Sequence, residues 1–407
     1  MVEKQANFVK VSGRDFTVNG EKILLRGFGL GSWMNLEHFM IGLPGTDSMI
    51  KKAFREIYGE ANAKQFFHRF LLEFVDDQDF QFLKRIGVNS IRIPFHYKYF
   101  IDDQNPYEYK KEGFVYLDHI INLCEKYEIY AILDMHSVPG GQNPDWHCDT
   151  TSGLPLFWEY RALRDTVISL WGHIADYYKN QPWIAAYDIV NEPAMVTDAK
   201  AFNEFYEQVI AEIRKYDPHH IIFIEGNDFT TDFSMLDPVD DPQVAYEFHF
   251  YPFVKEPLVL SREMSRERRM EIFTEAFTEL VSIREKYNRP VWCGELGLVF
   301  EQQDIDFQIT IIEDMLNLCE AHEVSWSLWT YKDAGVMGIV YPKMETPWRQ
   351  LTEEIKAVWN QHKEQEIGEA LVDYMANQYF QPIAPEDRYP LQFRMRKVLP
   401  GTGGGQH

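Results

Sequence analysis

Two glutamates stand where an apolar strand would end. Glu192 follows the apolar run 185–190, with Asn191 before it and Pro193 after it, and Glu295 lies in the run 290–298. A pair of facing carboxyl groups can supply the acid, the base and the nucleophile that break a glycosidic bond. A gap of about 5–5.5 Å predicts retention at the anomeric carbon, and about 6.5–9.5 Å predicts inversion. The sequence leaves that gap open.

Further polar or aromatic side chains stand at the ends of other predicted strands. A single histidine or arginine in such a place is more often structural than functional. Six strand ends of this kind in one chain are harder to assign to packing, and they predict a shared cleft. The side chains are Arg92, His136, Asn191 with Glu192, His249 with Tyr251, Glu295 and Trp329.

The neighbours of the two glutamates suggest different roles for them. Arg92 and Tyr251 are expected to hydrogen-bond Glu295 and to hold it ionised, as a nucleophile requires. Glu192 has apolar neighbours in the chain and lies close to a second carboxylate, so its pKa is expected to rise. A raised pKa suits a group that donates a proton.

Two more strand-end residues suit sugar binding. Asn191 is placed to bond a sugar 2-hydroxyl, and Trp329 would offer a flat apolar floor to a pyranose ring. Three further acidic residues are expected to be buried structural carboxylates: Asp134, Glu225 and Glu247.

The elements that must position these residues form a regular alternation. Near-continuous apolar runs predict strands buried on both faces, hence a parallel sheet. Helical stripes lie between them, at 114–127, 201–216, 270–287 and 305–319. This α/β pattern favours a (β/α)₈ TIM barrel over a doubly wound sheet, with the reactive groups at the carboxyl ends of the strands. The strands are predicted at 23–33, 89–95, 130–137, 185–193, 221–228, 244–253, 290–298 and 325–333.

Three additions to a minimal barrel are expected. Alternation around the turn signal Asn19-Gly20 predicts a β-hairpin that plugs the amino-terminal mouth. Long loops follow the first strand (34–75) and the third (138–155), and a helical and irregular extension follows the barrel. No stretch resembles a linker, so a single domain is expected, with the plug at 8–22, the barrel at 23–361 and the extension at 362–407 within residues 1–407.

Composition narrows the partners. The chain carries 63 acidic and 40 basic side chains, a formal charge of −23, which disfavours nucleic acid and anionic membranes and leaves neutral substrates open. The four cysteines have no CxxC spacing, and His147-Cys148 has no third ligand at suitable spacing, so neither a metal nor another cofactor is expected. Cys293 is expected to be a small core residue on the same strand face as Glu295. The amino terminus has no apolar leader, which predicts a cytoplasmic protein or one already trimmed of a signal.

Six motifs together resemble glycoside hydrolase family 5 of clan A. The resemblance covers 8–333 and implies a retaining mechanism with Glu192 as acid/base and Glu295 as nucleophile. The other strand-end residues match the family's characteristic positions. The motifs are SIRIPF (90–95), LDMH (133–136), IVNEPA (189–194), EFHFY (247–251), CGELGL (293–298) and SLWTYKD (327–333).

One branch of the family is especially similar. LRGFGLGSWMNLEHFM (25–40) resembles the LRGVNLGGWLVLEP stretch of exo-1,3-β-glucanases, and LDMHSVPGGQN (133–143) resembles their DLHGAPGSQN. The resemblance implies that Glu37 helps to bind the terminal sugar and that the long connections close the cleft into a pocket. Two departures, His38 in place of a proline and a longer segment at 144–153, leave the sugar and the linkage open.

The function expected is a retaining, exo-acting β-glycosidase that hydrolyses β-glucans, β-gluco-oligosaccharides or β-glucosides. Alternatives on the same residues are a β-mannosidase, an endo-glucanase or endo-mannanase, and a transglycosylase whose acceptor site would use Trp146, Trp158 and Phe39. A non-catalytic carbohydrate-binding barrel is disfavoured because both glutamates are present. The partner expected is thus a neutral β-linked oligosaccharide, polysaccharide or glycoside, and the oligomeric state stays open.

Overall fold

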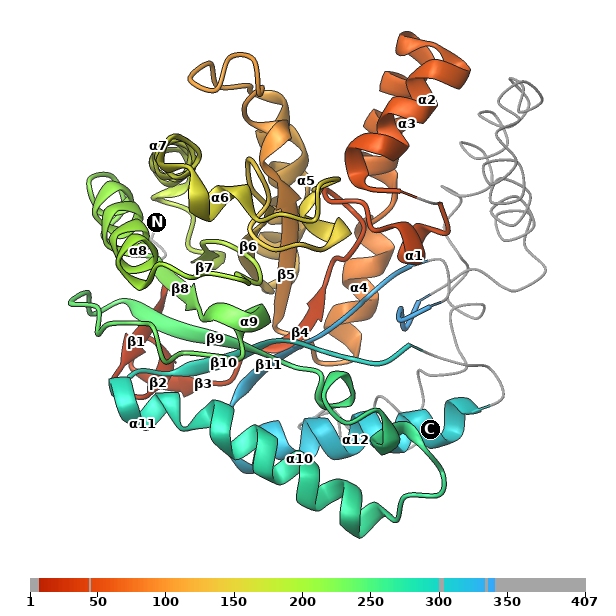
Figure 1. Ribbon diagram of the computed structural model, residues 1–407, viewed down its shortest axis with the longest axis vertical. Helices are drawn as coiled ribbons and strands as arrows, with labels where there is room; N and C mark the ends of the chain where they lie inside the picture. The colour runs from red at the N-terminus through yellow and green to blue at the C-terminus, as the bar shows by residue number, and fades with distance from the viewer. Residues whose placement is uncertain (1–6, 44, 300–303, 334–335, 341–407) are drawn as a thin grey trace, which may run out of the picture.

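A computed structural model describes residues 7–43, 45–299, 304–333 and 336–340 (Figure 1). Eight parallel strands close into a barrel, each paired with the next in chain order and the last paired with the first, which confirms the predicted TIM barrel. The strands are β4 (Arg26–Gly29), β5 (Ser90–His96), β6 (Tyr130–Ser137), β7 (Ile184–Asp188), β8 (Ile221–Glu225), β9 (Val244–Phe250), β10 (Val291–Leu296) and β11 (Ser325–Leu328).

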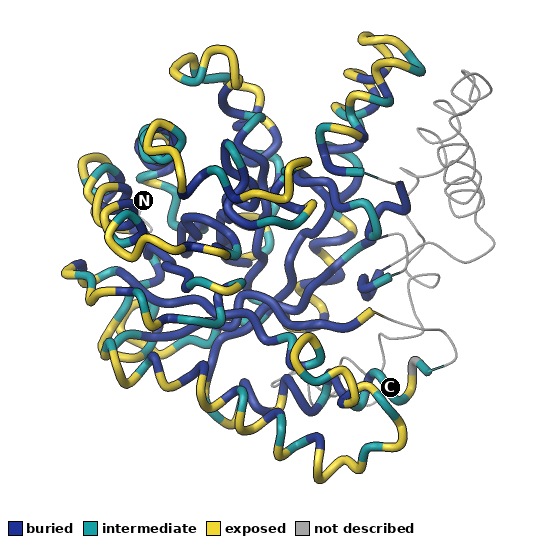
Figure 2. The backbone as a smooth tube through the Cα atoms, in the orientation of Figure 1, coloured by how far each residue is buried: buried dark blue, intermediate teal, exposed yellow. Residues whose placement is uncertain are grey.

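Helices surround the strands and expose their outer faces, whereas the barrel is buried almost throughout (Figure 2). Three predicted stripes are confirmed, and the stripe at 270–287 is divided at Ser282. None of the helices in the described ranges is long and apolar enough to cross a membrane. Apart from the elements of the two long connections, the helices between barrel strands are α4 (Asp77–Arg85), α5 (Glu112–Tyr127), α6 (Leu156–Glu159), α7 (Arg161–Tyr178), α8 (Ala199–Arg214), α9 (Asn227–Thr230), α10 (Arg266–Val281), α11 (Ile283–Tyr287) and α12 (Ile305–Ala321), with short 3-10 turns η1 (Tyr97–Tyr99), η3 (Pro252–Val254) and η4 (Pro257–Leu260).

The amino-terminal plug is a three-stranded antiparallel sheet rather than a single hairpin. Strands β1 (Val9–Ser12), β2 (Asp15–Val18) and β3 (Glu21–Ile23) pair in order. The Asn19-Gly20 turn lies between β2 and β3 as predicted, and a second turn at Gly13, where φ is +61°, adds the extra strand. Val9 and Phe16 pack against residues at the amino-terminal ends of the barrel strands, so the sheet closes that mouth.

The two long connections differ in structure. Residues 34–75 were expected as a loop but contain α1 (His38–Ile41), α2 (Asp47–Tyr58) and α3 (Glu60–Glu73), because Phe54, Phe66 and Phe70 give the segment an apolar face. Residues 138–155 have only the short 3-10 turn η2 (Trp146–Cys148). The backbone N–H of Ser48 donates to Asp149 (2.8 Å), so the two connections are joined at the rim.

The predicted extension at 362–407 lies outside the described residues, as does the end of the predicted barrel range beyond residue 340. The division into plug, barrel and extension, and the single domain over 1–407, therefore stay predictions.

Candidate active site

The interior of the barrel changes from apolar to acidic within one two-residue step along several strands. On β6 the inward series is Ile132, Asp134, His136, and on β8 Phe223 is followed by Glu225. Since alternate residues of a strand face the same side, each pair points into the barrel at successive heights. The acidic residues that surround the centre are Asp134, Asp188, Glu225, Glu247 and Glu295, and all are buried.

Arg92 stands at the centre of this acidic layer. Ile91 and Ile93 pack outward in the main core, which turns the side chain between them inward. The guanidinium donates to Asp188 (2.8 Å) and to Glu295, and it pairs with Asp134 (3.1 Å). Its charge is therefore shared among several carboxyl groups rather than spent on one.

Glu295 enters the cleft through an irregularity in β10. Trp292 packs with the plug inside the barrel, whereas Cys293 packs outside it, in the larger core cluster that also holds Cys319. The register shifts between Cys293 and Glu295, which turns Glu295 inward. Cys293 is a buried core residue as predicted, but its expected placement on the same face as Glu295 is wrong. A strict two-residue period does not hold across a bulge.

Glu192 lies on a loop beyond its strand. The predicted strand extended to Pro193, but β7 ends at Asp188. The backbone of Glu192 has φ of +50°, a left-handed conformation that non-glycine residues adopt rarely and that is often found at functional sites. Its N–H donates to Glu225 (2.6 Å), and the N–H of Asn191 donates to Met135 (3.2 Å). These hydrogen bonds hold the turn that directs the side chain into the mouth.

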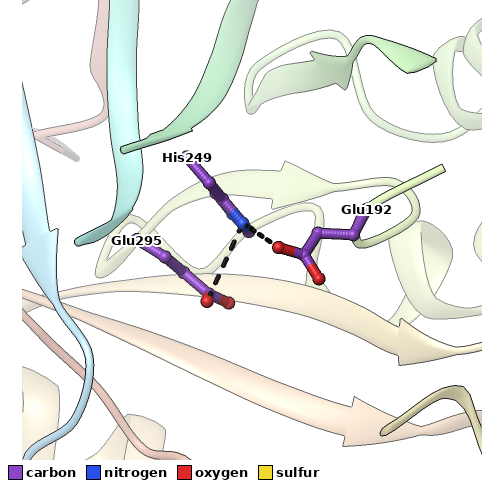
Figure 3. Close-up of side chains that lie close together, drawn as sticks. All are labelled: Glu192, His249 and Glu295. Atoms are coloured by element: carbon purple, nitrogen blue, oxygen red, sulfur yellow. Dashed lines mark hydrogen bonds and ion pairs between the residues drawn. The ribbon is translucent and has the colours of Figure 1, made fainter. Parts of the chain in front are cut away.

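His249 lies between the two glutamates, as Figure 3 shows. Its Nδ1 is 2.7 Å from Oε1 of Glu192 and 3.7 Å from Oε2 of Glu295. The hydroxyl of Tyr251 donates to Oε2 of Glu295 (2.9 Å). One carboxylate oxygen of Glu192 and one of Glu295 lie within 4.8 Å of each other. The structure thus brings the two predicted glutamates, Arg92, His249 and Tyr251 into one site.

Burial raises the pKa of both glutamates. For Glu192 this is the expected direction. A positive charge on His147 or Arg92 lowers the pKa of Glu192 and so opposes the rise. Arg92 and Tyr251 hydrogen-bond Glu295 as expected, yet burial still raises the pKa of Glu295, against the opposing effect of His249 and Arg92. Because burial lowers the pKa of His249 to about 4, Arg92 is the cation that favours the ionised form of Glu295 near neutral pH.

His136, Glu37 and Trp329 form the opposite side of the site. His136 lies 2.7 Å from Asp134 through Nδ1 and 3.7 Å from Glu37 through Nε2. Its ring lies parallel to that of Trp329, with centroids 5.4 Å apart. The Trp329 ring packs so close to Gly29 that a Cβ there would lie 2.5 Å from it. The Trp329 indole is therefore fixed against β4, the first strand of the barrel.

Asn191 is held by one side of its amide. Its Oδ1 accepts from Arg92 (2.8 Å), and its buried Nδ2 has no hydrogen-bond partner among the described residues. A buried amide donor without a protein partner is costly unless a ligand accepts from it. This fits the predicted bond to a sugar hydroxyl.

The three aromatic residues predicted for an acceptor site separate into two places. Trp146 is 40% exposed and meets the rings of Phe39 and His38 at the rim. Trp158 is only 7% exposed and donates its indole N–H to the carbonyl of Gln142 (2.8 Å). The prediction for Trp158 is therefore wrong, because this ring supports the loop from behind.

Two residues touch Glu192 that the sequence did not assign to the site, although His147 was considered there as a metal ligand. His147 Nε2 lies 3.3 Å from Oε2 of Glu192, and Asn143 donates to the Glu192 carbonyl (2.9 Å). Both come from the 138–155 connection, whose path a strand pattern does not predict. Cys148 turns away from His147 and bonds backbone carbonyls instead, so the two do not act as paired ligands.

Two groups of acidic residues and histidine among the described residues have their polar atoms close enough to surround a cation. Both contain His249, and they include Glu192 with Glu295 and Glu225 with Glu247. Arg92 already places a positive charge beside Glu295 and Glu247. A second cation there would be repelled, so these groups are better suited to protons than to a metal.

Comparison with known proteins identifies the class. The family model for cellulase (glycosyl hydrolase family 5) matches residues 59–335. The chain belongs to glycosyl hydrolase family 5, and it is a glycoside hydrolase with a carbohydrate substrate.

The named relatives differ in specificity. A beta-xylosidase of Phanerodontia chrysosporium is 37% identical over 86% of this chain and 76% of its own length. Endoglucanase C of Acetivibrio thermocellus is 25% identical over 64% of this chain and 84% of its own. Glucan 1,3-beta-glucosidase 2 of Wickerhamomyces anomalus is 27% identical over 59% and 58%.

The fold has solved counterparts. Thermotoga maritima Cel5A, in complex with a mannotriose substrate, superposes with a TM-score of 0.59 at 20% identity, over 82% of this chain and 97% of that one. At this identity the likeness establishes the barrel alone.

Proposed function

We propose that the protein is a retaining, exo-acting β-glycosidase that hydrolyses β-linked oligosaccharides or glycosides. The observation that carries this proposal is the approach of a Glu192 oxygen to within 4.8 Å of a Glu295 oxygen. Such a pair is closer to the gap of about 5–5.5 Å between the carboxyl groups of retaining enzymes than to the gap of about 6.5–9.5 Å in inverting enzymes.

In the first step a Glu295 carboxylate oxygen attacks the anomeric carbon while Glu192 gives its proton to the departing glycosidic oxygen. The bond to the leaving group breaks as the glycosyl ester on Glu295 forms. In the second step Glu192, now ionised, takes a proton from a water that attacks the same carbon. Glu295 leaves as a carboxylate, and Glu192 regains its proton.

The surrounding residues suit this sequence. Arg92 and Tyr251 donate to Glu295 and stabilise the negative charge that it carries before attack and on departure. The free N–H of Asn191 is available to the sugar 2-hydroxyl, whose bond strengthens toward the transition state. Trp329 supplies the apolar surface for the ring, with Glu37 and His136 beside it.

The two long connections support exo action. They join at Ser48 and Asp149, and again where the amide of Asn35 donates to the carbonyl of His147 (2.8 Å). A wall of this kind on one side of the glutamates would admit a chain end rather than the middle of a chain. Similarity to a beta-xylosidase along most of the chain favours a second substrate, a β-xyloside.

Glu295→Ala tests the nucleophile. Turnover should fall by at least about 10⁴-fold, because the covalent step is lost. Azide should restore activity with an aryl glycoside and yield a glycosyl azide of inverted configuration. Near-wild-type hydrolysis by Glu295→Ala would contradict the assignment.

Product analysis tests exo action and the sugar. Hydrolysis of an aryl β-glucoside and an aryl β-xyloside is compared first. An oligosaccharide of the preferred sugar, labelled at its reducing end, is tested next. Exo action predicts single sugars or the same small unit from the first minutes. Early release of long fragments would instead support an endo-glucanase or endo-mannanase.

A further inference from the structure

We propose that His147 is a positioning residue for acid catalysis: a neutral imidazole that accepts the proton of Glu192 and so keeps this group in its acid form. The inference rests on the proposed function of Glu192 as the acid/base. It assigns a role to the 144–153 segment, which departs from the branch that the sequence resembles.

The hydrogen bonds of Asn143 fix which nitrogen of His147 carries a proton. The backbone N–H of Asp145 donates to Oδ1 of Asn143 (2.9 Å), so its amide nitrogen must point the other way. That Nδ2 donates to the carbonyl of Glu192 (2.9 Å) and lies 2.8 Å from Nε2 of His147. Nε2 of His147 is therefore an acceptor, and its ring proton is on Nδ1.

An acceptor nitrogen facing Glu192 favours the protonated carboxyl. Nε2 of His147 is 3.3 Å from Oε2 of Glu192. Its single lone pair already accepts from Asn143, so an O–H on Oε2 shares that lone pair as a second, weaker donor. With a carboxylate, lone pairs on both atoms would face each other. The other carboxyl oxygen, Oε1, is left for Nδ1 of His249 (2.7 Å), and it accepts from that nitrogen in the tautomer that carries its proton on Nδ1. The protonated form of Glu192 thus satisfies both contacts at once.

Burial supports a neutral imidazole, because it lowers the pKa of His147 to about 4. A charged imidazole in this place would have the opposite effect and would stabilise ionised Glu192. The contact is also long, so the proton is held loosely and can turn to a glycosidic oxygen when substrate arrives. The other ionisable groups that act on Glu192 are Arg92, Asp134, Asp145, His249, Glu295, Glu37 and Tyr251, with Glu225 at its backbone.

Two substitutions of similar volume separate the acceptor from packing. His147→Gln presents an amide oxygen that can accept from Asn143 and face Glu192, whereas His147→Met fills the space with no strong acceptor. The pH profile of kcat/KM is measured with phenyl and dinitrophenyl β-glycosides of the preferred sugar. His96→Gln is the control, because His96 contacts the same connection through Asp149 and touches neither glutamate.

The alkaline limb of kcat/KM reports loss of the proton from the acid group. His147→Met should move this limb down by about half to one pH unit, the size of one lost hydrogen bond, and His147→Gln should stay close to wild type. His147→Met should also lose several-fold more activity on the phenyl than on the dinitrophenyl glycoside. An unchanged limb in His147→Met, or an upward shift in both variants, would overturn the proposal.

Glu192→Gln separates this inference from the function on which it rests. It should be severely impaired on the phenyl glycoside and much less on the dinitrophenyl glycoside, whose leaving group needs no proton. If Glu192→Gln lost activity equally on both, the acid/base assignment itself would fail. If it behaved as expected while His147→Met matched His147→Gln, only the role of His147 would fail.

Discussion

The two ends of the barrel interior are built from the same strands but from opposite kinds of side chain. Near the plug the interior holds Ile132, Phe223 and Trp292, packed with Phe16 of the plug. One step toward the carboxyl ends it holds buried carboxyl groups around Arg92. The same strands carry both kinds of side chain. The interior therefore changes from apolar to acidic along the barrel axis, not from one strand to the next.

The difference separates stability from chemistry. The apolar layer next to the plug, called the floor from here on, stabilises the fold because burial removes its aromatic and aliphatic side chains from water. The acidic layer works in the other direction: burial raises the pKa of Asp134 to about 7, and of Glu225 and Glu247 well above their usual value. Acids that resist ionisation suit a site that must store and move protons. The floor therefore has to offset what the upper layer costs.

Replacing the central cation should have the largest effect on both properties. Arg92→Met leaves several buried carboxyl groups without their counter-charge, so the free energy of unfolding should fall by about 3–5 kcal/mol. Activity per folded molecule should fall by about 10²–10³-fold, since Glu295 loses a preorganised donor. Chemical denaturation and kcat/KM at the same pH measure the two effects.

Arg92→Lys is the matched control for this substitution. It keeps the positive charge but cannot reach several acceptors with one planar group. Stability should recover in part, and activity much less. If Arg92→Met were as stable as wild type, the acidic layer would not depend on its cation.

A change in the floor should affect stability alone. Trp292→Ala removes a fully buried indole that packs against Phe223, and the free energy of unfolding should fall by about 3–5 kcal/mol. Per folded molecule, kcat/KM should remain close to wild type. Trp292→Phe is the control: the indole N–H donates to no atom in the described part of the chain, so replacing it should cost far less. A large loss of kcat in Trp292→Ala would show that the apolar layer also affects catalysis.

Sequence patterns predicted the barrel and most of the site because both follow from strand period and strand ends. Arg92 faces inward since Ile91 and Ile93 face outward, and the apolar strands between helical stripes left few other folds. The Asn19-Gly20 turn was equally local. These features were predicted correctly from patterns within one segment, although the helices within 34–75 and the turn at Gly13, which are also local, were missed.

Features that depend on distant contacts were missed. Glu295 faces inward because the register of β10 shifts after Cys293, and the sequence around Cys293 gives no sign of that shift. His147 reaches Glu192 only because the connection 138–155 folds back over the mouth, held by Asn35 and by Ser48. The bonds that place such a loop join residues far apart in the chain, and a single sequence does not reveal them.

The effect expected to be smallest over a single pH unit is a difference in pH dependence. The folded-state pKa of Asp134 is about 7, above the unfolded value of about 3.9, so the folded state holds this proton over a window in which the unfolded chain has lost it. This carboxyl therefore lowers the free energy of unfolding as pH rises from about 4 to about 7, by at most about 1.4 kcal/mol per pH unit. Asp134→Asn cannot ionise, so its stability should gain on wild type across that window and run parallel to it above the window. Urea unfolding of both proteins at closely spaced pH values measures the difference. A constant difference in the free energy of unfolding from pH 4 to 8 would show that Asp134 is ionised throughout. The acidic layer would then not resist ionisation at this position.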